Sequence, residues 1–169
     1  MATLNASLSV AFSATHLGDN PLTPQVHAPS IARTHDFANG VLAKQADILY
    51  ATELTIAGGA FTDIDLNGSL TNAASVAVNA LKVASIVVMA DPTNTTVVTV
   101  GGAAANAFVG PFGAATHTIK LSANAQFAIS DDSLAGLGSV TAGTADLLRI
   151  ANAAGASAKV RVAIVGRSA

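Results

Sequence analysis

The feature that most constrains the fold is a series of short segments rich in β-branched residues, each closed by glycine, asparagine or aspartate. The clearest segment is 95–100, in which six β-branched residues stand in a row before Gly101 and Gly102 end the run. Such residues favour an extended, pleated backbone. The uncharged loop that follows carries Phe108 and Phe112, which we expect to anchor it against the core.

Comparable segments recur about every ten residues, with turn residues between them. Strands are predicted at 47–57, 61–66, 81–89, 116–121, 125–130, 139–142, 146–151 and 157–165. The nearly unbroken apolar run at 81–89 indicates a central strand. The glycines at 58–59 suit a hairpin turn at 58–60, and the alanine-rich stretch 71–79 fits either a short helix or a loop. This pattern predicts an all-β fold, a β-sandwich or jelly roll, with less than about 15% helix.

The N-terminal 45 residues differ from the rest. A half-buried strand is predicted at 3–12, with its apolar side formed by Leu4, Ala6, Leu8, Val10 and Phe12. Residues 14–40 contain three prolines and no periodic pattern, so we expect neither a helix nor a paired strand there. The chain is therefore predicted to consist of a strand and an extended arm over 1–45, followed by a β-sandwich domain over 46–169.

The predicted arm carries few large apolar side chains, too few to order it alone against the loss of backbone freedom. We expect them to fill pockets on another subunit or on a larger shell. These candidate interface residues are Leu17, Leu22, Val26, Ile31 and Phe37.

Composition argues against several functional classes. Charged residues make up 11% of the chain, the net charge is −2, and the eight Lys and Arg are scattered, so a phosphate-binding surface for nucleic acid is not expected. Cysteine is absent, which excludes disulfides and thiolate metal sites. No secretory signal pattern opens the sequence and the longest apolar run, 84–90, is far short of a membrane span, so we expect synthesis in a cytoplasm and no membrane partner.

No residue set indicates catalysis, a cofactor or a metal. His16, His27 and His35 lie in the predicted arm at spacings that do not suit a metal site. Asp63 and Asp65 share one face of a predicted strand and could act as an acid–base pair, but a solvated strand face is the simpler interpretation. The Gly101-Gly102 pair lacks the lysine of a phosphate loop, and no G-x-S-x-G elbow occurs.

Three segments together resemble a known family. They are 65–73 (DLNGSLTNA), 99–108 (TVGGAAANAF) with Phe112 and Gly113, and 140–152 (VTAGTADLLRIAN). In order and spacing the sequence resembles the head decoration, or cement, proteins of tailed bacteriophages, over about residues 46–166. The resemblance implies a β-sandwich or jelly roll bound in many copies to the outer surface of the capsid. Its expected partners are the major capsid protein and copies of itself, as a dimer or trimer, and it implies no catalytic residue and no cofactor.

Other functions remain open at this point. A tail or baseplate protein of the same virion would share the composition. A cell-surface β-sandwich binding module would need a secretion signal, and a carbohydrate-active enzyme would be expected to use tryptophan and tyrosine, of which the chain has none and one.

Overall fold

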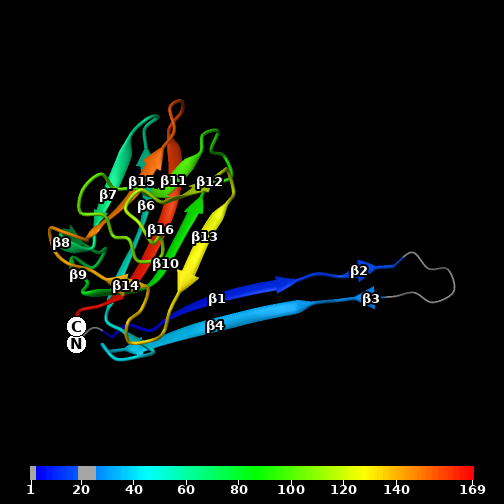
Figure 1. The fold of residues 1–169 in the computed structure, drawn as a ribbon, viewed down its shortest axis with the longest axis horizontal. Coiled ribbons are helices and arrows are strands. Elements are labelled where there is room, and N and C mark those ends of the chain that lie inside the picture. The colour runs from blue at the N-terminus through cyan, green and yellow to red at the C-terminus, as the bar shows by residue number, and fades with distance from the viewer. Residues whose placement is uncertain (1–2, 19–25) are drawn as a thin grey trace.

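The structure, a computed structural model, describes residues 3–18 and 26–169 (Figure 1). Within these residues the chain is all-β, with 0% helix and 55% strand. The prediction of an all-β chain with less than about 15% helix is therefore confirmed. None of the described residues belongs to a helix with the length and apolar character needed to cross a membrane.

The larger of two main sheets is antiparallel, with strand order β13-β10-β16-β6 and with β14 paired to one end of β10. Its strands are β6 (Ile48–Ile56), β10 (Lys82–Ala90), β13 (Gln126–Ser130), β14 (Gly138–Ser139) and β16 (Ala158–Arg167). The apolar run predicted to be central is β10, which has neighbours on both sides. Its position is therefore confirmed.

The smaller main sheet is also antiparallel, with the order β12-β11-β15-β7. Its strands are β7 (Phe61–Asp65), β11 (Val98–Gly101), β12 (Thr118–Leu121) and β15 (Leu147–Asn152). The loop after β11 returns Phe108 and Phe112 to the interior, where both are buried, as the sequence predicts.

One hydrophobic core joins the two main sheets. Alternate residues of each strand point into it, because side chains alternate across a strand. From the larger sheet the core takes Ile86, Val88, Val162 and Ile164, and from the smaller sheet Val98, Val100, Leu148 and Ile150, all buried. The opposite face of the larger sheet therefore points away from this core.

The turn at 58–60 does not form the predicted hairpin. Strands β6 and β7, which it joins, belong to different sheets, so the turn carries the chain from one sheet to the other. A Cβ atom on Gly58 would lie 1.8 Å from the backbone oxygen of Gly155. The glycine is required by this close approach of two loops.

A short third sheet pairs β8 (Asn67–Thr71) with β9 (Ala77–Asn79), so the prediction of a helix or loop over 71–79 is wrong at both ends of that stretch. The chain reverses between the strands at Asn72. Its Oδ1 accepts hydrogen bonds from the backbone N–H groups of Ala74 and Val76, both at 3.0 Å. An asparagine turn of this kind replaces helical hydrogen bonds locally.

The N-terminal segment forms a long two-stranded ribbon, which we call the N-terminal hairpin. Strand β1 (Ala6–Ser13) pairs along its whole length with β4 (Ser30–Asn39), and β2 (His16–Leu17) pairs in the same register with β3 (Val26–His27). The end of β4 also pairs in parallel with β5 (Gln45–Ala46). Figure 1 shows the hairpin, in blue and cyan, leaving the sheets and crossing the direction of their strands.

The expectation that no paired strand forms within 14–40 is therefore wrong for β2, β3 and β4. The period of two in β4 is hidden because Arg33 and His35 occupy the same face as Ile31 and Phe37. Pairing with β1 supplies the backbone hydrogen bonds that the isolated segment lacks. Pro29 lies just outside the ladder, and the other two prolines fall within 19–25, outside the described residues.

Candidate interaction surface

The N-terminal hairpin has two chemically different faces. Directly opposite residues of an antiparallel pair share a face, so the register assigns every side chain. The face that we call the apolar face carries Ala6, Leu8, Val10, Phe12, Ile31, Arg33, His35 and Phe37. The polar face carries Ser7, Ser9, Ala11, Ser13, Ser30, Ala32, Thr34 and Asp36.

Burial along the apolar face changes from root to tip. Phe37, at the root, is 2% exposed and packs with Ala46, Ala84 and Val165. Farther out, Val10 and Phe12 are 54% and 57% exposed, and Ile31, directly opposite Phe12, is 71% exposed. The same face is thus a packed contact at one end and an uncovered apolar surface at the other.

The paired residues beyond Ser13 extend this exposed apolar surface. Leu17 and Val26 lie directly opposite each other and are 68% and 60% exposed. By alternation they lie on the other side of the ribbon from Phe12 and Ile31. The outer hairpin therefore presents large apolar side chains on both sides.

The structure separates the predicted interface residues into three groups. Leu17, Val26 and Ile31 lie exposed on the outer hairpin. Phe37 is buried within its own chain, where it anchors the hairpin root, so it is not available to a partner. Leu22 falls within 19–25 and lies outside the described residues.

The sequence predicts Val10 and Phe12 on the buried side of a half-buried strand, but both side chains are exposed. Their alternation with serines correctly indicates a two-faced strand. The pattern does not indicate that β1 pairs with β4 outside the main sheets, where none of the other described residues covers the outer part of the ribbon.

One polar contact joins the root of the hairpin to the larger sheet, and another closes the root itself. The Nδ1 atom of His35 lies 2.8 Å from the hydroxyl of Ser130 on β13. Within the root, the backbone N–H of Leu4 donates to Oδ1 of Asn39 at 3.0 Å. Together with the packing of Phe37, the contact between His35 and Ser130 sets the direction in which the hairpin leaves the body.

A buried arginine reinforces this junction. Arg167 is 0% exposed, and its Nε donates to the backbone oxygen of Gln45 at 2.7 Å. Its Nη1 and Nη2 donate at 3.4 and 3.5 Å to the backbone oxygens of Leu134 and Asp132. Burial lowers the pKa of this guanidinium, while Asp131 and Asp132 act to raise it. One side chain thus ties the end of β16 to β5 and to the 131–134 loop.

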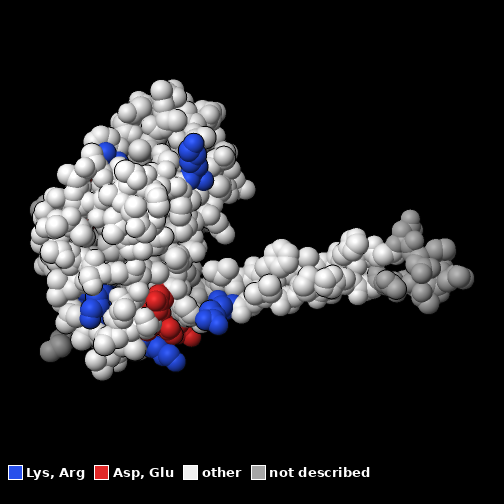
Figure 2. Space-filling model, in the orientation of Figure 1, with Lys and Arg blue, Asp and Glu red and all other residues white. Residues whose placement is uncertain are grey.

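The outer part of the hairpin carries no formal charge in its described residues. Segments 11–18 and 26–32 contain no Asp, Glu, Lys or Arg. Figure 2 shows the same uncharged surface beyond the root of the hairpin. Isolated β-ribbons are usually protected from association by charged residues, and this one has no such protection there.

The outward side chains of the larger sheet are arranged in three rows, because the register aligns its four long strands. The root row, beside the hairpin root, contains Leu49, Val165, Ser85 and Ser130. The middle row contains Ala51, Ala163, Val87 and Ala128. The end row contains Glu53, Arg161, Met89 and Gln126.

Three residues of the middle row, Ala51, Ala163 and Val87, form the floor of a shallow trough, which we call the sheet groove. Two adjoining hollows meet at Val87 and Ala163 and extend the groove to Ala51. One wall is the hairpin root, which contributes Leu8, and the other wall is the end row, which contributes Met89. The floor is low because two of these three side chains are alanines.

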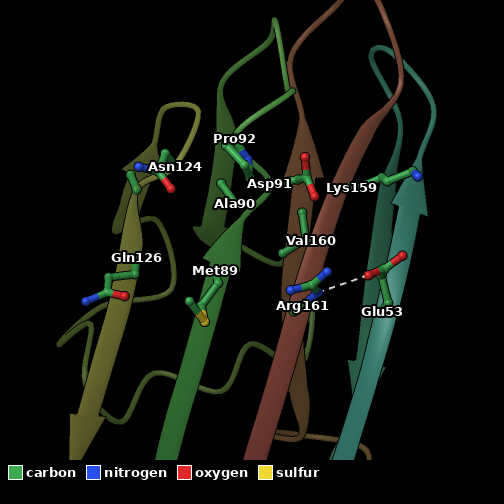
Figure 3. Close-up of a pocket in the computed structure, with 11 residues that line it drawn as sticks. Glu53, Met89, Ala90, Asp91, Pro92, Asn124, Gln126, Lys159, Val160 and Arg161 are labelled. Carbon is green, nitrogen blue, oxygen red and sulfur yellow. Dashed lines mark hydrogen bonds and ion pairs between the residues drawn. The ribbon is translucent and has the colours of Figure 1, made fainter.

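The end row and the hollow beyond it are shown in Figure 3. Arg161 and Glu53 form an exposed ion pair at 3.0 Å. The carboxylate of Asp91, at the rim of the hollow, accepts bonds from the hydroxyl and the backbone N–H of Thr93, and these bonds lower the pKa of Asp91. The Asp91 carboxylate therefore stabilises the loop in which it lies.

The paired carboxylates at 63 and 65 are not a freely solvated face, contrary to the sequence interpretation. Arg149 donates two hydrogen bonds to the Asp63 carboxylate, at 2.7 and 2.8 Å, and this two-point ion pair raises the pKa of the arginine. Arg149 also stacks on Phe61, 3.6 Å from the ring centroid. Asp65 accepts a hydrogen bond from the backbone N–H of Asn67. Both carboxylates are thus engaged in holding their strand in place.

The histidines are dispersed over the molecule. His16 and His27 lie opposite each other on the outer hairpin, and the His117 ring nitrogen Nδ1 lies 2.7 Å from the backbone oxygen of Phe112. Among residues 3–18 and 26–169, no three His, Cys, Asp or Glu side chains come together in a metal-binding arrangement. No protein-family model and no curated protein matches this sequence.

Proposed function

We propose that this protein is a structural component of a tailed-phage virion, a decoration protein that binds the outside of the head and stabilises contacts between capsomers. In this proposal the two main sheets form a β-sandwich of the jelly-roll type. The N-terminal hairpin is its extended arm, and the protein acts as a homo-oligomer in contact with the major capsid protein.

The observation that carries the proposal is the projecting hairpin with its uncovered apolar side chains. Single exposed apolar residues are common on monomers, but here Val10, Phe12, Leu17, Val26 and Ile31 are gathered on one element. A paired ribbon that leaves the body can reach past the edge of its own subunit. That is the geometry that a protein joining neighbouring subunits of a shell requires.

The rest of the molecule supports an assembled, repetitive setting. Polar groups at the candidate sites, such as Asp63 and Arg149, are used to hold strands together. Low charge gives the surface little self-repulsion. Many identical weak contacts on a symmetric shell reinforce one another through effective concentration.

The experiment compares the full-length protein with a short-hairpin variant on heads of the encoding phage that were isolated without this protein. Residues 11–32 are replaced by Asn-Gly, which closes the ribbon after the directly paired residues Val10 and Arg33 with a two-residue turn. The root residues, including Phe37, remain, so the body keeps its own packing. We expect co-sedimentation of the variant with heads to be at least about tenfold weaker at equal concentration.

Cryo-electron microscopy of intact virions then locates the protein. Density on the outer head surface, present in many copies, is the expected result. Density on the tail or baseplate, or no virion density at all, contradicts the proposal. Equal head binding by the short-hairpin variant contradicts the role given to the hairpin.

A further inference from the structure

We infer that the outer N-terminal hairpin of one copy docks in the sheet groove of a second copy of this chain. The contact joins two different surfaces, so it is head-to-tail and propagates until a ring closes. It does not depend on the capsid as a partner and is expected in solution.

The first argument is that the molecule itself already makes this type of contact. At the hairpin root, the apolar face packs on the outer face of the larger sheet, with Phe37 against Val165. The uncovered part of the hairpin continues that apolar face, and the sheet groove continues the outer sheet surface next to the root. The proposed contact therefore repeats between copies what the chain does within one copy.

The second argument is complementarity of size. The floor of the groove is made of small side chains, Ala51, Ala163 and Val87. The hairpin presents large ones, with Phe12 and Ile31 side by side on one face. Large side chains over a floor of small ones allow close packing of two β layers.

The third argument is that the directions agree. The groove follows the middle row, which runs from strand to strand across the larger sheet. Figure 1 shows that the hairpin also runs across the direction of these strands.

A hairpin cannot reach the groove of its own chain. Its root, fixed by Phe37 and by the His35–Ser130 contact, forms one wall of that groove, and the ribbon then leads away from the body. In a head-to-tail pair the incoming hairpin would lie beside the root of the receiving copy. The side of the hairpin that carries Phe12 and Ile31 and the sheet groove would then be covered by one repeated contact.

The test uses two full-length variants, each defective on one side of the contact. The hairpin variant is Phe12→Ser with Ile31→Ser. The groove variant is Ala51→Lys with Ala163→Glu, which fills the floor with a directly paired, opposite-charge couple that suits a strand pair. Matched controls carry the same changes at exposed apolar sites outside both surfaces, Val76→Ser with Val109→Ser and Val76→Lys with Val109→Glu.

Mass is measured by light scattering and sedimentation from about 1 to about 100 µM, a range that covers the affinity of ordinary transient interfaces. We expect the unmodified protein and both controls to be oligomers. Each variant alone should be a monomer, with association weakened roughly a hundredfold. Circular dichroism with thermal melting confirms that each variant is folded.

Mixing the two variants gives the decisive result. The intact hairpin of the groove variant can enter the intact groove of the hairpin variant, so the mixture should form a heterodimer and stop there. A hairpin-to-hairpin contact would leave the groove variant self-associated, and a sheet-to-sheet contact would leave the hairpin variant self-associated. Self-association of either variant alone overturns the inference. So does an unmodified protein that is monomeric, or a pair of folded variants that does not form the heterodimer. Head binding is measured separately, because it tests the proposed function and not this contact.

Discussion

Replacing Asn152 by alanine tests how the far ends of the two main sheets are held together. Asn152 ends β15 in the smaller sheet and is buried. Its Nδ2 donates to the backbone oxygens of Ile56, at the end of β6 in the larger sheet, and of Ala156, at 3.0 and 2.9 Å. Its Oδ1 accepts a hydrogen bond from the hydroxyl of Thr96 at 2.6 Å. One amide therefore connects both sheets and two loops.

The expected loss follows from counting these bonds. Asn152→Ala removes three hydrogen bonds, each worth about 0.5–1.5 kcal/mol, and leaves the oxygen of Ile56 without that partner. The free energy of unfolding should fall by about 2–4 kcal/mol. Thr96→Val keeps the shape of the side chain but breaks the bond to Oδ1 and a longer one, 3.5 Å, to the backbone oxygen of Ala156, so it should cost about 1 kcal/mol. Asn152→Asp turns a donor into a second acceptor facing two carbonyl oxygens and should cost more than the alanine variant.

Urea unfolding at a single protein concentration is the assay, because self-association would otherwise contribute to stability. With a slope of about 1–3 kcal/mol per M, the midpoint for Asn152→Ala should fall by about 1–2 M. The melting temperature should drop by roughly 5–15 °C. A loss of less than about 1 kcal/mol for Asn152→Ala, or an Asp variant as stable as the unmodified protein, would refute the idea that this amide joins the sheets.

Two further predictions concern charged groups. Replacing Asp63 and Asp65 by Asn should lower the free energy of unfolding in urea titrations by about 1–2 kcal/mol, because the two-point pair with Arg149 is lost. The oligomer mass should not change. A changed mass would give these residues a role in assembly. Hydrogen bonds from Ser133 lower the pKa of Asp131, as those from Thr93 lower the pKa of Asp91. The stability that these carboxylates supply is present above their pKa in the unfolded chain, near 4, and is lost as the pH falls through their lower pKa in the folded protein. The urea midpoint should therefore be constant from about pH 7 to 5 and should fall below about pH 4. Asp131→Asn should reduce that fall, and an unchanged pH profile would contradict the assignment.

The body of the fold was largely accessible from the sequence. Strands β10 and β16 were found because alternation and apolar runs depend on the strand itself. The sequence does not predict that the turn at Gly58 carries the chain from the larger sheet to the smaller one. A glycine turn indicates that the chain reverses but not which strand it then pairs with. That choice depends on the loop containing Gly155, far along the sequence.

The sequence alone predicts only part of the candidate interaction surface. Three exposed residues of the outer hairpin, Leu17, Val26 and Ile31, stand out in the sequence as isolated apolar residues. Strand β4 was hidden by Arg33 and His35, which interrupt its apolar face. Alternation also placed Phe12 on a common face with Ala6 without indicating that only the root of that face is covered. The three rows of the larger sheet depend on the register of four strands from distant parts of the chain.

The packed root of the N-terminal hairpin has a mechanical consequence. From Ala6 to Leu17 the ribbon spans eleven residue steps, or about 36 Å. A swing of about 5° at the root would move the tip by about 3 Å, roughly the rise of one strand residue. The position of the tip relative to another molecule is therefore determined at the hairpin root, by the packing of Phe37 and the hydrogen bonds of Arg167. A small structural change at the root would therefore displace the exposed apolar side chains of the outer hairpin, although it makes no contact with them.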